Sequence, residues 1–343
     1  MKKITFILIA FVNSCLAQTK YSSTSEEFNN FHYLITTAER MYKNDSSLQA
    51  YAKFDDAIQN YKGVVNPTHY FDFAIVSLKI REEFKALDYF EKAITNGVVV
   101  DSTMMKYISF QNQNTKKEFY TNYPKWKETH NASINSEWEG NLYQSTVDNK
   151  KFQSAVYTGA TEFCVKCLAN KACNKKAPEF LSKLKLVKEK QKADSIAVSQ
   201  LVTDIKKHNT FPNLNVLDKE ACATARNILL NYDADKTNSR LDDMLFKALN
   251  NADISPAFYA TVIDRRNVMN GLLPEFYEPI TGYEKTVQAV LPAANIKRKT
   301  IGLHPIILQT KVKTATTPVK GAKGSKAPEK SSGPITDKNI YNY

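Results

Sequence analysis

One short pattern of small and aromatic residues occurs twice in the first hundred residues of this chain. The two copies lie 36 positions apart and read Ala50-x3-Phe54-x2-Ala57 and Ala86-x3-Phe90-x2-Ala93. Residues three and four positions apart share one face of a helix, so each copy places two small side chains and a ring on that face. Small side chains let a second helix approach closely, and the ring fills the space beside them. The pattern predicts two helical hairpins.

A first helix is expected ahead of each copy. Its inward positions are Leu34, Thr37, Ala38 and Met41 in one unit, and Tyr70, Phe73, Ala74 and Ser77 in the next. A third unit begins near Met104, but it carries large rings where small residues should stand, and Pro124 interrupts it. We interpret this third unit as a degenerate cap that ends the array.

The unit length and the A-x3-F spacing resemble the tetratricopeptide repeat. The resemblance implies a protein-binding role in which the first helices line a concave groove. The candidate groove residues are His32, Ile35, Glu39, Tyr42, Phe71, Ile75, Leu78 and Lys79. Apolar anchors among polar residues suit the capture of a peptide or a protein edge. The alternative is that two units are too few for a groove and pack as a bundle with the later domain.

The chain as a whole is expected to be all-α, with tetratricopeptide-like hairpins followed by a second helical domain. Its 10 glycines are few for a protein of many tight β-turns, and its 343 residues are enough for two domains. The net charge of +12 is concentrated in residues 310–343 and 174–193. Because the charge is not an arginine-rich face with interleaved aromatics, we expect no nucleic-acid partner.

The N-terminus has the features of a secretory signal peptide. Lys2 and Lys3 precede an apolar run, and Ala17 is a small residue at the expected cleavage point, so residues 1–17 are read as the signal. The alternative is lipidation at Cys15, although Asn13 fits a lipobox poorly. No later segment is apolar enough for a transmembrane helix. We expect an exported protein, periplasmic or secreted, with a lipid-anchored form as the alternative.

The remaining boundaries follow from changes in composition. The expected segments are a polar lead-in (18–30), the repeats (31–130), a helical connector with a cluster of cysteines (131–200), a helical domain (201–309) and a disordered Lys-rich tail (310–343). We expect a Lys-rich helix within 174–193 and a further helix from about Asp194 to Lys207. Three more helices are expected at about 217–231, 239–250 and 255–270, with irregular chain over 272–309. The sequence indicates no particular oligomeric state.

Four cysteines follow the expected cleavage point: Cys164, Cys167, Cys173 and Cys222. An even number in an exported protein favours disulfides, with three possible connectivities. Buried free thiols are the main alternative. The spacing Cys-x2-Cys-x5-Cys matches no structural zinc pattern, and a redox Cys-x2-Cys needs a thioredoxin-type setting that is not predicted here. We therefore expect no metal and no cofactor.

Residues 194 to 280 resemble the end domain of an uncharacterised family of bacterial envelope proteins. The shared motif is Tyr259-Ala260-x3-Asp264-Arg265-x5-Gly271-x2-Pro274-x2-Tyr277. Glu275 stands where that family has Gln, and Glu278-Pro279-Ile280 where it has Gly-Thr-Gln. The resemblance implies an architecture and no defined chemistry.

Tyr259, Asp264, Arg265, Glu275 and Tyr277 form the best polar cluster in the sequence. The functional interpretation is a charged cleft in which Arg265 holds an anion and Asp264 orients it. The structural interpretation is that Asp264 and Arg265 tie the 272–280 loop to the domain, and we favour it.

No metallohydrolase, nucleophile-elbow, phosphate-loop or dinucleotide motif occurs in the sequence. The leading hypothesis is a scaffold that binds a protein or peptide of the envelope. The alternatives are an enzyme acting on an anionic envelope component and a purely structural component.

Overall fold

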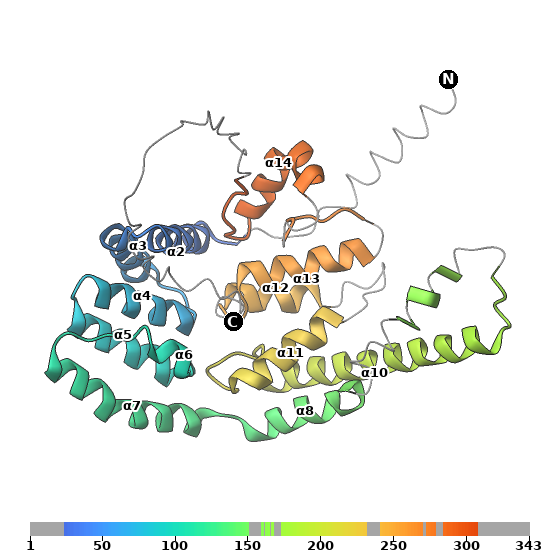
Figure 1. Ribbon diagram of the computed structural model, residues 1–343, viewed down its shortest axis with the longest axis horizontal. Coiled ribbons are helices and arrows are strands. Elements are labelled where there is room, and N and C mark those ends of the chain that lie inside the picture. Colours follow the sequence, from blue (N-terminus) through green and yellow to red (C-terminus); the bar gives the residue numbers. More distant parts are fainter. Residues whose placement is uncertain are drawn as a thin grey trace, which may run out of the picture.

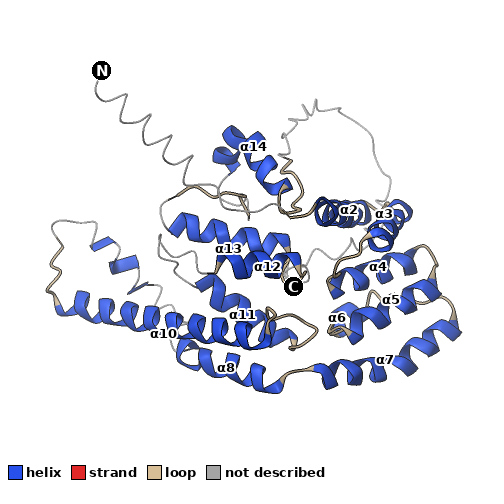
Figure 2. Cartoon of the chain, turned by 180° about the vertical axis from the view of Figure 1, so that it is seen from behind, coloured by secondary structure: helices blue, strands red, loops and turns tan. Residues whose placement is uncertain are grey.

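The computed structural model describes residues 24–150, 159–160, 162–164, 166–167, 173–231, 241–269, 272–278 and 284–307. Within these residues the fold is all-α, as predicted, and Figure 2 shows helices joined by loops with no strand. No helix in these ranges is long and apolar enough to cross a bilayer. The expected signal peptide with Cys15 and the expected tail lie outside the described residues.

Two helical hairpins form the N-terminal half. Helix α2 (Glu26–Lys43) packs on α3 (Ser47–Asn60), and α4 (Pro67–Lys79) packs on α5 (Glu83–Thr95). The small residues predicted at the helix contacts, Ala50, Ala57, Ala86 and Ala93, are at most 2% exposed. Phe54 and Phe90, the two rings between them, are equally buried. The predicted close packing of each hairpin is therefore confirmed.

Two sequence expectations about this half are wrong. Helix α2 begins at Glu26 rather than after residue 30, because the Ser25 hydroxyl accepts the N–H of Phe28 at 3.1 Å and caps the helix. The third unit has only a short first helix, α6 (Ser102–Met105), and its second helix α7 (Gln113–Ser133) continues through Pro124. Phe119 and Trp126 on either side of the proline are buried in the hairpin core, and this burial offsets the lost hydrogen bond.

The C-terminal half packs around its own core. Helix α8 (Ser136–Lys150) lies along α10 (Pro178–His208) and α11 (Lys219–Asn231), and α12 (Asp242–Asn250) lies against α13 (Pro256–Met269). Their buried side chains include Trp138, Leu142, Leu201, Cys222 and Tyr259. The three helices expected at 217–270 are present, with the Ser255 hydroxyl accepting the N–H of Phe258 at 3.1 Å to cap α13. The expected break before Asp194 is absent, since α10 is one helix of 31 residues.

The expected irregular chain over 272–309 is also wrong, because α14 (Glu284–Lys299) forms there with Pro292 inside it. The C-terminal end of α14 is fixed by Arg298, whose guanidinium donates to the carbonyl oxygens of Phe276 and His304, both at 2.8 Å. The carbonyl of Thr300 then accepts the N–H of Thr24 at 3.0 Å, just ahead of α2. The helices thus follow an arc through α7 and α8 that is closed where α14 meets α2 (Figure 1).

Candidate functional site

A seam runs between α2, α4 and α6 on one side and, on the other, the start of α11, the loop before α13, and α14 with the segment after it. Three hollows lie along it, named here the outer hollow, the middle cavity and the inner hollow, with volumes of about 590, 180 and 50 Å³. Gly302 and Leu303 line both the outer hollow and the middle cavity. Thr68 and Asp72 line both the middle cavity and the inner hollow. The three hollows are therefore neighbours.

The outer hollow lies between α2 and α14. Its lining residues are Glu26, Asn29, Asn30, Tyr33, Pro292, Asn295, Ile296, Lys299, Gly302, Leu303 and Pro305. Tyr33 and Ile296 are 50% and 67% exposed, although both are large and largely apolar. The Tyr33 ring stacks on the His304 ring with centroids 5.3 Å apart, which holds the tyrosine beside the hollow. The outer hollow thus presents apolar side chains that solvent can reach.

Glu39, His69 and Asp72 meet in the middle cavity. Glu39 comes from α2, and His69 and Asp72 lie one turn apart on α4, which begins where Asn66 caps it and Pro67 occupies its first position. One potential ligand atom from each side chain lies within 4.8 Å of the others. His69 Nδ1 is 3.8 Å from Glu39 Oε1, too far for a hydrogen bond.

Burial sets the ionisation of this cluster. It raises the pKa of Glu39 to about 7, and it raises the pKa of Asp72 well above its ordinary value with a further contribution from the Glu39 charge. Lys43 lowers both carboxyl pKa values, but less strongly than burial raises them. Burial also lowers the pKa of His69 to about 4, and that of His32, which the nearby His69 lowers further. Both imidazoles are therefore neutral at pH 7, and each keeps a nitrogen lone pair.

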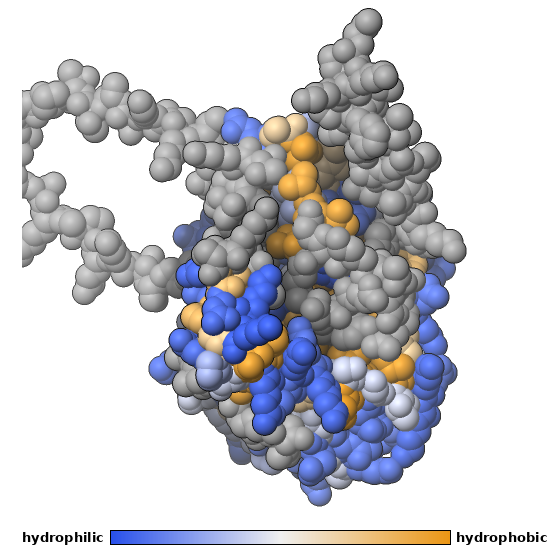
Figure 3. All heavy atoms as spheres, turned by 90° about the vertical axis from the view of Figure 1, so that its right-hand side faces the viewer, coloured by the Kyte–Doolittle hydropathy of each residue, from blue (hydrophilic) through white to orange (hydrophobic). Residues whose placement is uncertain are grey.

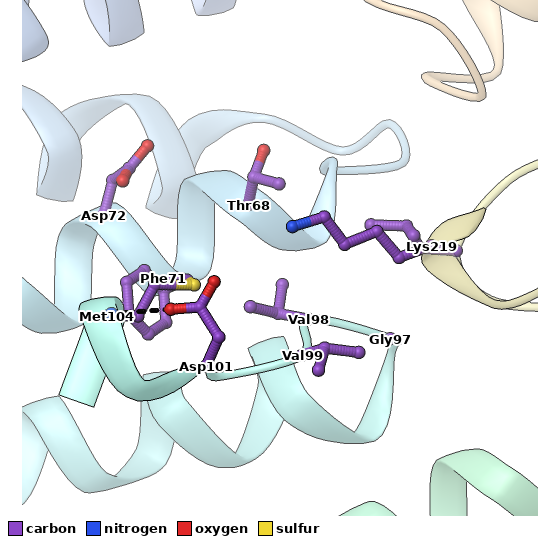
Figure 4. Close-up of a pocket in the computed structure, with 10 residues that line it drawn as sticks. Thr68, Phe71, Asp72, Gly97, Val98, Val99, Asp101, Met104 and Lys219 are labelled. Carbon is purple, nitrogen blue, oxygen red and sulfur yellow. Dashed lines mark hydrogen bonds between the residues drawn. The ribbon is translucent and has the colours of Figure 1, made fainter. Parts of the chain in front are cut away.

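The inner hollow lies where α4 and α6 face the start of α11. Figure 4 shows the Lys219 side chain reaching from α11 toward α4, while Asp72 and Asp101 stand on the hairpin side. Asp101 is committed to capping α6, since its carboxylate accepts the N–H groups of Thr103 and Met104 at 2.8 and 2.9 Å. At about 50 Å³ the inner hollow has room for little more than solvent.

The groove predicted from the repeats is not an open apolar surface. Ile35, Phe71, Ile75 and Leu78 are buried in the hairpin core and at most 6% exposed, because they pack between the helices of the hairpins. Tyr42 is half-buried, and Lys79 is exposed. Burial and the nearby Asp72 charge raise the pKa of Tyr42 to about 12. From the predicted set, Glu39 and His32 line the middle cavity.

The polar cluster around Asp264 does not converge on a cleft. The Asp264 carboxylate accepts the backbone N–H groups of Glu275, Phe276 and Glu278 at 2.6, 2.8 and 2.7 Å. Burial raises its pKa, and these three donors oppose that shift. Arg265 points to solvent, Tyr259 and Tyr277 are buried, and Glu275 pairs with Lys297 at 3.1 Å. This arrangement agrees with the structural interpretation for Asp264, which ties the 275–278 segment to its helix, but not for Arg265, which is exposed.

The four cysteines that the structure describes form one bridge rather than two. Cys167 and Cys173 are joined by a disulfide, with Cα atoms 5.3 Å apart. Cys164 and Cys222 are free and buried, and they cannot pair because they belong to different cores, one beside Phe180 and one inside the C-terminal half.

Figure 3 shows the face at the right of Figure 1, where α10 begins. Hydrophilic residues cover much of the described surface there, with hydrophobic ones between them.

Sequence reasoning missed His69 and Asp72. The available signal was their spacing of three, which puts both side chains on one face of a helix. The 36-residue offset also predicted that this helix lies beside the one carrying Glu39. Neither signal shows that the C-terminal half covers these side chains. That depends on how segments about 180 positions apart come together, such as those carrying Asp72 and Ala252, which line the same cavity.

Comparisons with protein-family models, with curated proteins and with solved structures each return no match. We therefore infer what the seam can bind from the residues that line it. The outer hollow offers apolar contacts that solvent reaches, and the middle cavity offers a compact set of oxygen and nitrogen donors.

Proposed function

We propose that the protein is an exported binding protein that holds an extended, apolar segment of a partner protein in the outer hollow. The observation that carries this proposal is the hollow of about 590 Å³ between α2 and α14, with Tyr33 and Ile296 exposed beside it. A volume of this size accommodates several apolar side chains. Exposed apolar residues gathered at a concave site are typical of protein interaction surfaces.

The walls of the outer hollow are held in place before a partner arrives. Asn295 Oδ1 accepts the N–H of Ile306 at 2.7 Å, which fixes the segment after α14 against that helix. The Asn29 side-chain amide donates a hydrogen bond to the carbonyl oxygen of Thr24, and the Thr24 hydroxyl donates one to the carbonyl oxygen of Thr300. These bonds fix the start of α2 to the same segment. A preformed wall reduces the ordering cost of binding and so favours affinity.

The chemistry of the lining sets the kind of partner segment. Pro292, Ile296, Leu303 and Pro305 provide apolar contact, which a peptide with apolar side chains can bury. Asn30 is exposed at the edge, and its amide can both donate to and accept from the backbone of an extended peptide. The proposed site in the envelope follows from the expected signal at residues 1–17.

Selection from a displayed library of random peptides tests this proposal. We expect the purified chain from residue 18 to enrich apolar, extended peptides, and Ile296→Asp to weaken their binding at least ~10-fold because a buried carboxylate opposes an apolar contact. Leu273→Asp is the matched control, since Leu273 is 62% exposed and lies outside the seam. Equal peptide affinity for the wild type and Ile296→Asp would contradict the proposal.

A further inference from the structure

Glu39, His69 and Asp72 form a compact set of metal-ligand types on two neighbouring helices. Within the ranges that the structure describes, they are the one group of three or more His, Cys, Asp or Glu side chains whose ligand atoms all lie within 4.8 Å of one another. Ligand atoms of a tetrahedral zinc ion, each bound at about 2.1 Å, stand roughly 3.4 Å apart. Small side-chain rotations are therefore enough to bring the three atoms into a coordination sphere.

The hydrogen-bonding state of His69 is an independent observation that points to a ligand between these side chains. His69 Nδ1 is buried and makes no hydrogen bond, although buried polar atoms are normally bonded. It faces the Glu39 carboxylate at 3.8 Å, a separation that a shared ion can bridge. His32, only 6% exposed, stands in the wall of the same cavity, with its ring centroid 6.0 Å from that of His69.

The cavity supplies both space and an electrostatic reason for a cation. At about 180 Å³ it has room for an ion and several water molecules beside the three side chains. Two carboxyl groups taken out of bulk water are disfavoured as anions, and a divalent cation between them removes that penalty. The Lys43 ammonium on the next turn of α2 lies close enough to lower the pKa of both carboxyl groups, and its positive charge opposes a bound cation.

We infer that Glu39, His69 and Asp72 bind a divalent transition-metal ion, with zinc the best fit, at the middle cavity of the seam. A mixed set of imidazole and carboxylate donors favours zinc and its first-row neighbours over Mg²⁺ and Ca²⁺, which prefer oxygen alone. Three protein ligands leave at least one coordination position facing the cavity, where a water molecule, His32 or a ligand group can bind. None of these three side chains lines the outer hollow, so metal binding can be tested independently of the proposed function.

Zinc titration of the purified, chelator-treated chain from residue 18 tests the inference. We expect saturable binding of one zinc ion by calorimetry, a rise in the thermal midpoint with zinc, and no rise with Mg²⁺ at the same concentration. Glu39→Gln, His69→Gln and Asp72→Asn should each weaken zinc binding at least ~10-fold. His130→Gln is the matched control, because His130 is also buried but lies on α7 away from the cavity, and it should leave zinc binding unchanged.

Two further measurements separate this site from its alternatives. The double variant Cys164→Ser, Cys222→Ser should retain zinc binding, and X-ray absorption at the zinc edge should show nitrogen and oxygen ligands without sulfur. Glu39→Gln and Asp72→Asn replace a partly buried carboxyl group with a neutral amide of nearly the same shape, so both variants should fold without zinc, which circular dichroism checks. Absence of saturable binding by the wild type, sulfur ligation, or full zinc binding by folded Asp72→Asn would each overturn the inference.

Discussion

Gly97 faces the backbone carbonyl of Leu214 so closely that a β-carbon on Gly97 would overlap it. Gly97 ends the second hairpin with a φ of +103°, and Leu214 belongs to the loop before α11. The contact therefore joins the hairpin half to the C-terminal half, beside the inner hollow that both residues line. A glycine is required here both by the left-handed backbone and by the close approach.

Replacing Gly97 with alanine should destabilise the protein by roughly 3 kcal/mol or more, because strain at positive φ adds to overlap with a backbone atom. Urea unfolding measures the change. Gly140→Ala is the matched control, since Gly140 lies within α8 and nothing stands within 4 Å of an added β-carbon. That variant should be neutral or up to ~1 kcal/mol more stable. A Gly97→Ala variant as stable as the wild type would contradict the described contact.

Asp264→Ala should cost about 2 to 4 kcal/mol of stability, because it leaves three backbone N–H groups of the 275–278 segment without their acceptor. Arg265→Ala, at the exposed neighbouring position, should change stability by less than ~0.5 kcal/mol. Chemical denaturation of both variants makes the comparison. A stable Asp264→Ala protein that has lost an activity retained by Arg265→Ala would favour the enzymatic interpretation instead.

The two free thiols should be protected in the folded protein. Cys222 is fully buried, and burial raises the pKa of its thiol to about 12, so neither access nor thiolate formation favours reaction at pH 8. We expect Cys222 and the buried Cys164 to resist alkylation in the native chain from residue 18 and both to react in denaturant. Mass spectrometry after labelling would also find Cys167 and Cys173 unlabelled without reductant. Rapid native labelling of Cys222 would contradict its placement in the core.

Asp253 should make stability depend on pH between about 4 and 6. Burial raises its pKa to about 6, against the opposing hydrogen bonds from Phe211 and Asn213. The folded protein then holds a proton that the unfolded chain has released, so the contribution of Asp253 to stability falls as the pH rises through this range and is constant above it. The loss should be roughly 2 to 3 kcal/mol. Denaturation of the wild type and Asp253→Asn at several pH values should show this slope in the wild type alone, and parallel curves would contradict it.

The hairpins were predictable because their determinants are local. The alanines at 50, 57, 86 and 93 lie at fixed helical spacing from the rings between them, and short-range spacing is what a sequence displays directly. The starts of α4 and α13 are determined just as locally, since Asn66 and Ser255 cap these helices and a proline follows each of them.

The errors have a common physical cause. Pro124 and Pro292 predict helix ends from local sterics, yet both helices continue because distant contacts compensate, through Phe119 in one case and Arg298 in the other. The middle cavity was also not predicted, because it too depends on contacts between residues distant in the sequence. Glu39 and His69 look like ordinary surface groups of a helical repeat until the loop before α13 closes over them.

Site-specific photocrosslinking in the cells that produce the protein tests the central claim, that the outer hollow holds a segment of another protein. A photoreactive amino acid in place of Ile296 should give one discrete adduct with a partner protein, and a peptide selected on the purified chain should suppress that adduct. The same replacement at Leu273 should give none. No adduct from position 296, or equal adducts from both positions, would contradict the account.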